Sequence, residues 1–149
     1  MSRGFLLDTN VPSETLRPSP TPAVIAWLEA QSKDVQFVSV VSVGELRRGA
    51  TLLVPGSARR TQLEQYIETK LPLLFATRVL PVTQAIAERW GILDAQRQAA
   101  GQPLGMADGM IAATALEHNL TVVTRNVKDF AGLGVAVLSP WEKVPDRER

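Results

Sequence analysis

The sequence predicts an α/β protein in which helices cover both faces of a parallel sheet. Short apolar segments alternate along the chain with segments in which apolar residues recur at helical spacing, and turns separate them. This alternation is typical of a parallel sheet, because each crossover helix returns the chain to the start of the next strand. We expect strands at residues 4–7, 35–41, 79–82, 120–124 and 135–138. We expect helices at residues 24–31, 42–53, 57–74, 83–100 and 107–118.

In the first half of the chain, the strand at residues 4–7 is apolar and ends at Asp8. The segment 35–41 is β-branched and aromatic, which favours a second strand. The helix after it should end at the Pro–Gly pair 55–56, and a longer helix should follow over residues 57–74. The apolar residues in register are Leu46, Ala50 and Leu53 in the first of these helices and Leu63, Ile67 and Leu71 in the second.

In the second half, a short strand at 79–82 leads into a helix with one apolar stripe. A loop at 101–105 separates that helix from the next one, 107–118, which Asn119 should terminate. Two apolar strands complete the sheet. The stripe of the longer helix consists of Ile86, Trp90 and Leu93.

Composition indicates a globular protein with a substantial core, because 45% of its 149 residues are apolar and 21% are charged. We expect a single domain over residues 1–149, with a flexible tail at about 143–149. No apolar run reaches the roughly 18 residues that a membrane span needs, so no membrane association is expected. The absence of cysteine fits a cytoplasmic protein. The net charge is only +1, so a nucleic-acid substrate would require a local basic patch.

Four polar residues stand where an α/β enzyme would carry its site. Asp8 follows the first strand and Asn126 follows the fourth, whereas Glu45 and Asp108 lie in first turns of helices. In open parallel sheets, sites form beyond the carboxyl ends of the strands. With no Cys and a single His, a catalytic metal would be bound mainly by oxygen, which suits Mg²⁺ or Mn²⁺. A carboxylate cluster with such an ion is typical of metal-dependent phosphodiester hydrolases.

Asp108 supports this interpretation, because its helix spacing places it on an apolar face. That face also contains Ile111, Ala112 and Ala115. A carboxylate buried there needs a partner, because an unpaired buried charge is costly. A metal ion shared with Asp8 would supply that partner.

Each of the four residues also has a purely structural explanation. Asp8 could form a turn, and Asp108 could complement the helix dipole. Ser42 and Glu45 match a capping box, and Asn126 could cap a short turn. Their joint placement favours a functional site over these separate explanations.

The arginine pairs of the chain offer the local basic patch that the net charge does not reveal. The pairs at residues 47–48 and 59–60 are more often solvent-exposed faces than ligand sites. Arg47 or Arg48 could nevertheless reach a bound phosphate, because both follow Glu45 closely. Arg125, beside Asn126, could do the same.

Other function classes fit less well. The phosphate-binding and dinucleotide-binding glycine motifs are absent, and no His–Asp relay supports serine chemistry. A phospho-acceptor signalling domain needs a second acid beside the strand-end Asp8, where the chain has Leu6 and Leu7, and usually a Lys after the last strand, where it has Ser139 and Pro140. A non-catalytic binding protein that kept the fold remains open.

The motifs together resemble those of the PIN-domain ribonucleases, in particular the VapC toxins of type II toxin–antitoxin pairs. The resemblance spans nearly the whole chain, and the ending LSPW is similar to a FitB-like subgroup of these toxins. The motifs that carry it are FLLDTNVPSE, SVVSVGELRRG, ADGMIAATALEHNLTVVTRNVKDF and LSPW.

The resemblance implies a three-layer α/β/α sandwich with a five-stranded parallel sheet, and Mg²⁺-dependent cleavage of RNA in which Mn²⁺ can substitute. It implies that Asp8 and Asp108 bind the metal, that Glu45 holds a water or a second ion, and that Asn126 lies in the outer shell. Many relatives carry Asp where this chain has Asn126, which puts a fully acidic second metal site in doubt. Asp129 is also often acidic in the family.

The resemblance further implies partners. We expect a VapB-like antitoxin, a homodimer of the toxin, and contact with operator DNA through the antitoxin alone. The helices at 24–31 and 42–53 could line a groove for the antitoxin, although their apolar residues could equally be core. Those residues are Trp27, Leu28, Leu52 and Leu53.

Overall fold

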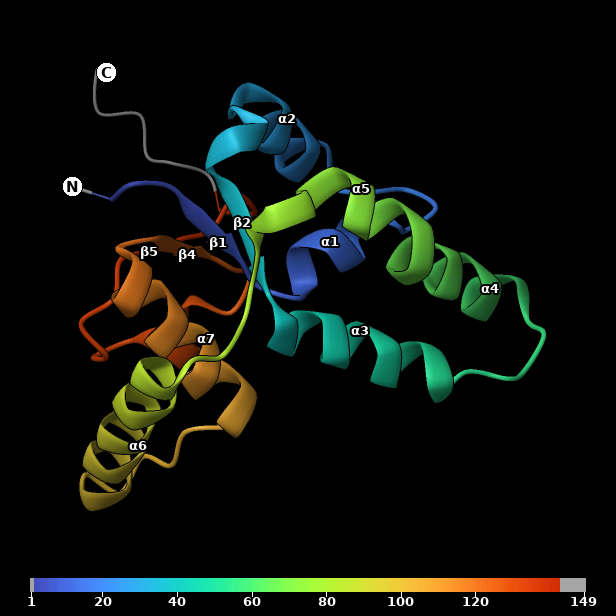
Figure 1. Ribbon diagram of the computed structural model, residues 1–149. Helices are drawn as coiled ribbons and strands as arrows, with labels where there is room; N and C mark the ends of the chain where they lie inside the picture. Colours follow the sequence, from blue (N-terminus) through green and yellow to red (C-terminus); the bar gives the residue numbers. More distant parts are fainter. Residues whose placement is uncertain (1, 143–149) are drawn as a thin grey trace.

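The computed structural model describes residues 2–142, and a five-stranded parallel sheet with the strand order β3-β2-β1-β4-β5 lies at its centre (Figure 1). The strands are β1 (Phe5–Leu7), β2 (Gln36–Ser39), β3 (Val79–Leu80), β4 (Thr121–Val123) and β5 (Val137–Leu138). Leu6 of β1 pairs with Phe37 of β2 on one side and with Val122 of β4 on the other. The predicted fold class is confirmed. The predicted tail at 143–149 lies outside the described residues.

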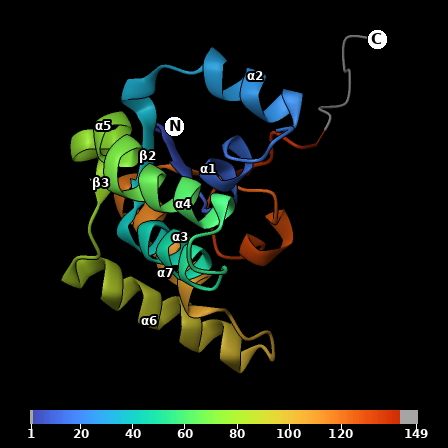
Figure 2. The ribbon, with the colours of Figure 1, turned by 90° about the vertical axis from the view of Figure 1, so that its right-hand side faces the viewer.

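Helices cover both faces of the sheet and give three layers (Figures 1 and 2). α6 and α7 pack on one face, whereas α1, α3, α4 and α5 supply the core on the other. The helices are α1 (Asn10–Thr15), α2 (Pro22–Ala30), α3 (Val40–Thr51), α4 (Ala58–Gln65), α5 (Leu71–Phe75), α6 (Gln84–Ala99) and α7 (Met106–His118). In the described residues, no helix is long and apolar enough to cross a membrane.

The central strands are apolar on both faces, which fixes them between the two helical layers. Leu6 and Val122 belong to the core under α6 and α7, whereas Leu7 and Val123 belong to the opposite core. Successive side chains of a strand point to opposite faces, so each strand contributes to both cores. The residues just beyond these strands are therefore held by a rigid support.

The junction between β2 and α3 differs from the prediction. The β-branched segment was expected to remain a strand through residue 41, but β2 ends at Ser39 and α3 begins at Val40. The Ser39 hydroxyl accepts a hydrogen bond from the backbone N–H of Val41 at 3.0 Å, so Ser39 is the N-cap. α1 was not predicted at all, because a helix of six residues is too short to show periodicity.

The predicted helix at 57–74 is present as three consecutive helical segments. α4 continues into a π-helical segment, Tyr66–Lys70, and then into α5. Pro72 lies at the start of α5 and lacks the N–H that a regular α-helix would use. A π-helical turn is a common way to accommodate such an interruption.

α7 approaches α6 closely at Gly109, the residue that follows Asp108. A Cβ atom on Gly109 would lie 2.6 Å from Cδ1 and 2.9 Å from Nε1 of Trp90, so this position requires glycine. The close contact fixes the first turn of α7, which carries Asp108. α7 ends as predicted at Asn119, which adopts the left-handed conformation with φ of 54°.

Candidate active site

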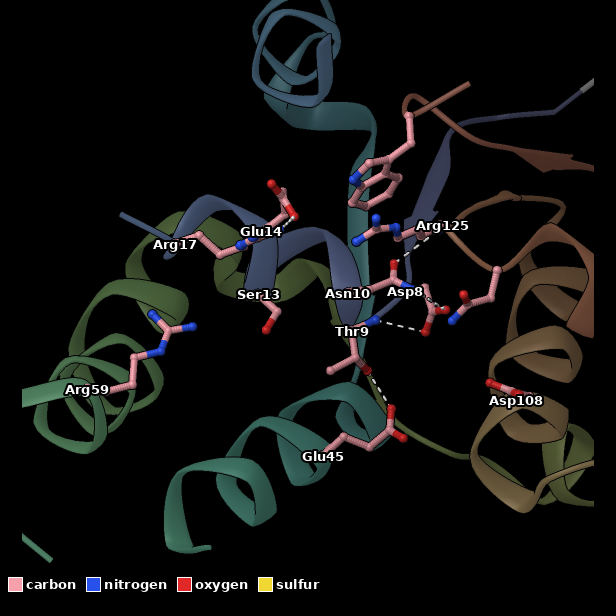
Figure 3. Close-up of a pocket in the computed structure, with 12 residues that line it drawn as sticks. Asp8, Thr9, Asn10, Ser13, Glu14, Arg17, Glu45, Arg59, Asp108 and Arg125 are labelled. Carbon is pink, nitrogen blue, oxygen red and sulfur yellow. Dashed lines mark hydrogen bonds and ion pairs between the residues drawn. The ribbon is translucent and has the colours of Figure 1, made fainter. Parts of the chain in front are cut away.

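Side chains from four parts of the chain meet at the carboxyl edge of the sheet and line a cleft of about 530 Å³ (Figure 3). Asp8 follows β1, Asn126 follows β4, Glu45 lies in α3, and Asp108 lies in the first turn of α7. All four residues selected from the sequence line this one cleft. The strand order explains their convergence, because β1 lies between β2, which leads into α3, and β4.

Asp8 is the most deeply buried of the four, with 5% of its surface exposed. Its Oδ1 accepts a hydrogen bond from the backbone N–H of Thr9 at 2.8 Å, and its Oδ2 accepts one from the Thr124 hydroxyl at 2.8 Å. Burial raises the pKa of Asp8, although these two hydrogen bonds oppose the rise; the charges of Glu45 and Asp129 add to it. Its carboxylate would therefore gain from a bound cation.

Thr124 connects the ends of β1 and β4. Its hydroxyl donates to Asp8 and accepts from the backbone N–H of Asn126 at 3.0 Å and from Nδ2 of Asn10 at 3.3 Å. Because a hydroxyl carries one proton, the two accepted bonds leave that proton for Asp8. Asn10 Oδ1 in turn accepts from the backbone N–H of Arg125 at 3.3 Å, which fixes the segment after β4.

A hydrogen bond from Thr9, and not helix capping, orients the Glu45 side chain. Its carboxylate accepts a hydrogen bond from the Thr9 hydroxyl, whose oxygen also lies 2.9 Å from the Ser42 hydroxyl. The capping-box explanation for Ser42 and Glu45 is wrong, because Ser39 is the N-cap and Ser42 lies buried inside α3. Thr9 therefore links Glu45 to Asp8, because its hydroxyl bonds Glu45 and its backbone N–H bonds Asp8.

Asp108 is half-buried and has an unusually high pKa. Burial, followed by the charges of Asp8, Asp129 and Glu45, raises the pKa of Asp108 to about 6. Within residues 2–142, its carboxylate has no hydrogen-bond or ion-pair partner. The helix-dipole explanation is insufficient, because a favourable dipole lowers the pKa of an acid.

Asn126 and Asp129 both lie on the segment that follows β4. Asn126 lines the cleft and precedes a 3₁₀ helix, Val127–Phe130, but its side chain makes no capping hydrogen bond to that helix. Asp129 lies on the 3₁₀ helix, and its charge raises the pKa of both Asp8 and Asp108. The fourth carboxylate that acts on the site is thus Asp129.

The basic residues at the cleft differ from those first suggested by the sequence. Arg47 forms an ion pair with Glu68 at 3.1 Å, and neither Arg47 nor Arg48 lines the cleft. Arg125 lines it, as the sequence suggested, and so does Arg59, which had been assigned to a solvent-exposed face. Arg17 is a third lining arginine that the sequence did not indicate.

The donor set of the cleft fits a hard divalent cation. Asp8 and Asp108 are carboxyl groups whose pKa values are raised by burial and by the charges of neighbouring carboxylates. In the described part of the chain, no three His, Cys, Asp or Glu side chains lie close enough to form a complete metal site. Two carboxylates are a donor set that Mg²⁺ commonly uses while it keeps several waters.

Comparison with known proteins identifies the family. The PIN domain matches residues 5–134. The chain belongs to the PIN-domain family. It is 41% identical to the toxin FitB of Neisseria gonorrhoeae, over 92% of this chain and 98% of that protein. It is 38% identical to the VapC ribonuclease Y4jK of Sinorhizobium fredii, over 93% and 98% of the two chains. The predicted resemblance to VapC and FitB toxins is therefore confirmed.

Solved PIN-domain structures confirm the fold. The crystal structure of FitAcB from N. gonorrhoeae has a TM-score of 0.85 and 40% sequence identity, and the match covers 93% of this chain and 99% of that one. FitAB bound to an IR36 DNA fragment has a TM-score of 0.85 and 38% identity, with 94% and 97% covered. The three-layer PIN sandwich predicted from the resemblance is thus present.

Two residues of the site, Asn10 and Glu14, are not evident from the sequence. Asn10 contacts both Asp8 and Thr124, and the run Asp8-Thr9-Asn10 after a strand was the signal that could have indicated it. Glu14 is buried, accepts from the backbone N–H of Thr21 at 2.7 Å, and has a lowered pKa because of that bond. No sequence pattern reveals this contact, because it depends on how the loop after α1 folds back.

Replacing Glu45 by Gln should lower RNA cleavage by about a hundredfold or more without changing the melting temperature. Gln keeps an acceptor for the Thr9 hydroxyl but loses the negative charge, and single catalytic groups of this kind contribute roughly a hundred- to ten-thousandfold. Calorimetry and an RNA cleavage assay measure the two effects. Equal losses of stability and activity would indicate that Glu45 serves the fold alone.

Proposed function

We propose that this PIN-domain protein is the toxin of a type II toxin–antitoxin pair and that it hydrolyses RNA phosphodiester bonds with Mg²⁺, for which Mn²⁺ can substitute. The observation that carries the proposal is the pair Asp8 and Asp108, two carboxylates with raised pKa values in one cleft. The identity to the toxin FitB and to a VapC ribonuclease supports it.

Asp8 and Asp108 would hold the metal ion. When bound, the ion lowers the pKa of water and stabilises the charge that develops on the phosphate. Asp8 is suited to this role because Thr124 and the Thr9 backbone fix both of its oxygens. Asp108 is suited because its carboxylate has no other partner within residues 2–142.

Glu45 and Asn126 would act around these ligands. The Thr9 hydroxyl holds the Glu45 carboxylate at the cleft, where it can accept a proton from the attacking water. The Asn126 side chain can donate or accept a hydrogen bond to a metal-bound water. Asp129 adds negative charge, which favours cation binding although Asn126 itself is neutral.

The proposed partner is a small antitoxin. FitAcB and FitAB are complexes in which relatives of this chain were solved, and FitAB was solved with DNA. We expect this chain to bind a VapB-like antitoxin, to form a homodimer, and to reach operator DNA through the antitoxin. An RNA-cleaving toxin would act in the cytoplasm.

The suggested antitoxin groove is supported only in part. Trp27, Leu28 and Leu53 pack against the core, and Trp27 meets Phe5 edge-to-face at 4.9 Å. These residues fit the core interpretation. Leu52, at the end of α3, is 70% exposed and remains the member of the set that a partner could cover.

The proposal is tested by purifying the chain with the antitoxin encoded beside it, removing the antitoxin, and measuring cleavage of mixed RNA. The free chain should cleave RNA with Mg²⁺ or Mn²⁺, chelation should stop cleavage, and added antitoxin should inhibit it. Cleavage by a chain that has no antitoxin and is harmless on expression would indicate a housekeeping nuclease. A folded chain that cleaves no RNA with either metal would indicate a non-catalytic binding protein.

A further inference from the structure

Three arginines line the acidic cleft, but their charges are not equally available. Arg17 forms an ion pair with Glu14 at 3.2 Å. Arg59 donates to the backbone carbonyl of Leu16 at 2.6 Å, so it is engaged by the turn after α1. The Arg125 guanidinium has no ion-pair or hydrogen-bond partner among residues 2–142. It is therefore the cation at the cleft that is free to meet an incoming anion.

Arg125 remains free although acids surround it. It lines the main cleft with Asp8 and also lines a neighbouring hollow with Asp129 and Glu142. A guanidinium so placed would ordinarily pair with a carboxylate. Here its Cζ atom lies 5.8 Å from the centroid of the Trp141 ring, a cation–π contact that does not neutralise its charge.

Trp141 contributes its ring and not its N–H group. The indole Nε1 is buried and has no acceptor in the described residues, whereas the side chain packs against the core on the sheet face that α1, α3, α4 and α5 cover. An unused buried donor costs free energy, so the value of tryptophan at this position lies in its aromatic face. That face is held by packing and carries Arg125.

We propose that Arg125 binds a phosphate of single-stranded RNA in the cleft, and that Trp141 is the positioning residue that keeps Arg125 away from the metal-binding carboxylates. RNA is a polyanion that must approach at least three acids, and one unpaired guanidinium beside them offsets part of that repulsion. The inference rests on the RNA-cleaving function proposed above and adds the residue that recruits the substrate.

The inference is tested by binding and not by cleavage. A fluorescent single-stranded RNA of mixed sequence is titrated in metal-free buffer, at several salt concentrations, with the inactive Asp8→Asn chain as the parent. Adding Arg125→Gln should weaken binding about tenfold, the value of one charge-assisted hydrogen bond. It should also lower the slope of log affinity against log salt by about 0.7, as expected for one phosphate contact on a single strand.

Trp141 is tested by a double-mutant cycle. Trp141→Leu should weaken binding about two- to fivefold, and Trp141→Phe should retain binding because it keeps an aromatic face. In the Arg125→Gln chain, Trp141→Leu should have no further effect, since the ring acts through the guanidinium. An equal effect in both backgrounds would show that the ring contacts RNA directly, and it would overturn the positioning role.

Arg3→Gln is the matched control, because Arg3 makes the same kind of contact with Phe37, at 5.2 Å, before the start of β1 and away from the cleft. Its removal should leave binding unchanged. If the Arg125→Gln chain bound RNA with wild-type affinity and salt slope, the inference would be overturned while the proposed RNA cleavage would stand. The same holds if the Arg125→Gln chain lost only its affinity for the antitoxin. Absence of RNA cleavage by the wild-type chain, with binding still dependent on Arg125, would overturn the proposed function instead.

Discussion

Asn in place of Asp8 is expected to lower RNA cleavage by about a thousandfold, because losing a metal ligand removes several kcal/mol of transition-state stabilisation. The fold should survive. Burial already makes the Asp8 carboxylate costly, and the oxygen of the neutral amide can still accept the backbone N–H of Thr9. The amide nitrogen cannot accept the proton of the Thr124 hydroxyl, so one hydrogen bond is lost, and the removal of the buried charge offsets that loss. The melting temperature of the metal-free protein should therefore not fall, whereas added Mn²⁺ should no longer raise it.

Asp34→Asn is the matched control for the loss of one negative charge. Asp34 is exposed and precedes the amino end of β2, whereas the cleft lies at the carboxyl ends of the strands. It should leave both cleavage and the Mn²⁺-induced rise in melting temperature unchanged. Full activity of the Asp8→Asn chain would remove Asp8 from the metal site, and unfolding of that chain would assign it to the fold.

The sequence located the site because parallel-sheet topology makes strand ends meet. Asp8 and Asn126 each follow a strand of a parallel sheet, so their location at the same end of the sheet could be predicted from the sequence. The structure adds that β1 and β4 are neighbours, which brings the two residues close together. Asp108 could be predicted because an acid on the apolar face of a helix lacks a partner. These three inferences depend on local patterns that the fold leaves intact.

The errors arose where a tertiary contact decides between equivalent local patterns. Ser39 and Ser42 both could have capped α3, and the β-branched residues between them favoured the later start. In the structure Ser42 instead meets Thr9, which also holds Glu45. Similarly, helical spacing cannot tell that Arg59 faces the cleft and Arg47 does not. Such choices depend on side chains from elements distant in sequence.

The pH dependence of Mn²⁺ binding should show whether Asp108 binds the metal ion. Its pKa is raised from 3.8 to about 6 in the metal-free protein, so between these values the folded protein holds a proton that the unfolded chain has lost. The contribution of Asp108 to the free energy of unfolding is therefore greatest below about pH 4. It falls as the pH rises from about 4 to 6 and is smallest above pH 6. Glu14 has the opposite shift, but its pKa is lowered from 4.5 and its contribution is lost only at more acidic pH.

Metal competes with this proton, so the dissociation constant for Mn²⁺ should rise by about tenfold for each pH unit below 6, with Asp8 steepening the trend because its pKa is also raised. Calorimetric titration of Mn²⁺ between pH 5 and 7.5, about the range that brackets this pKa, measures the slope. Asp108→Asn should bind Mn²⁺ weakly throughout and show a shallower slope. It should also melt higher than the wild type in metal-free buffer at neutral pH, because the cost of the half-buried charge and its repulsion by Asp8, Asp129 and Glu45 are both gone. An unchanged slope would mean that Asp108 does not bind the ion, even if its replacement abolished cleavage.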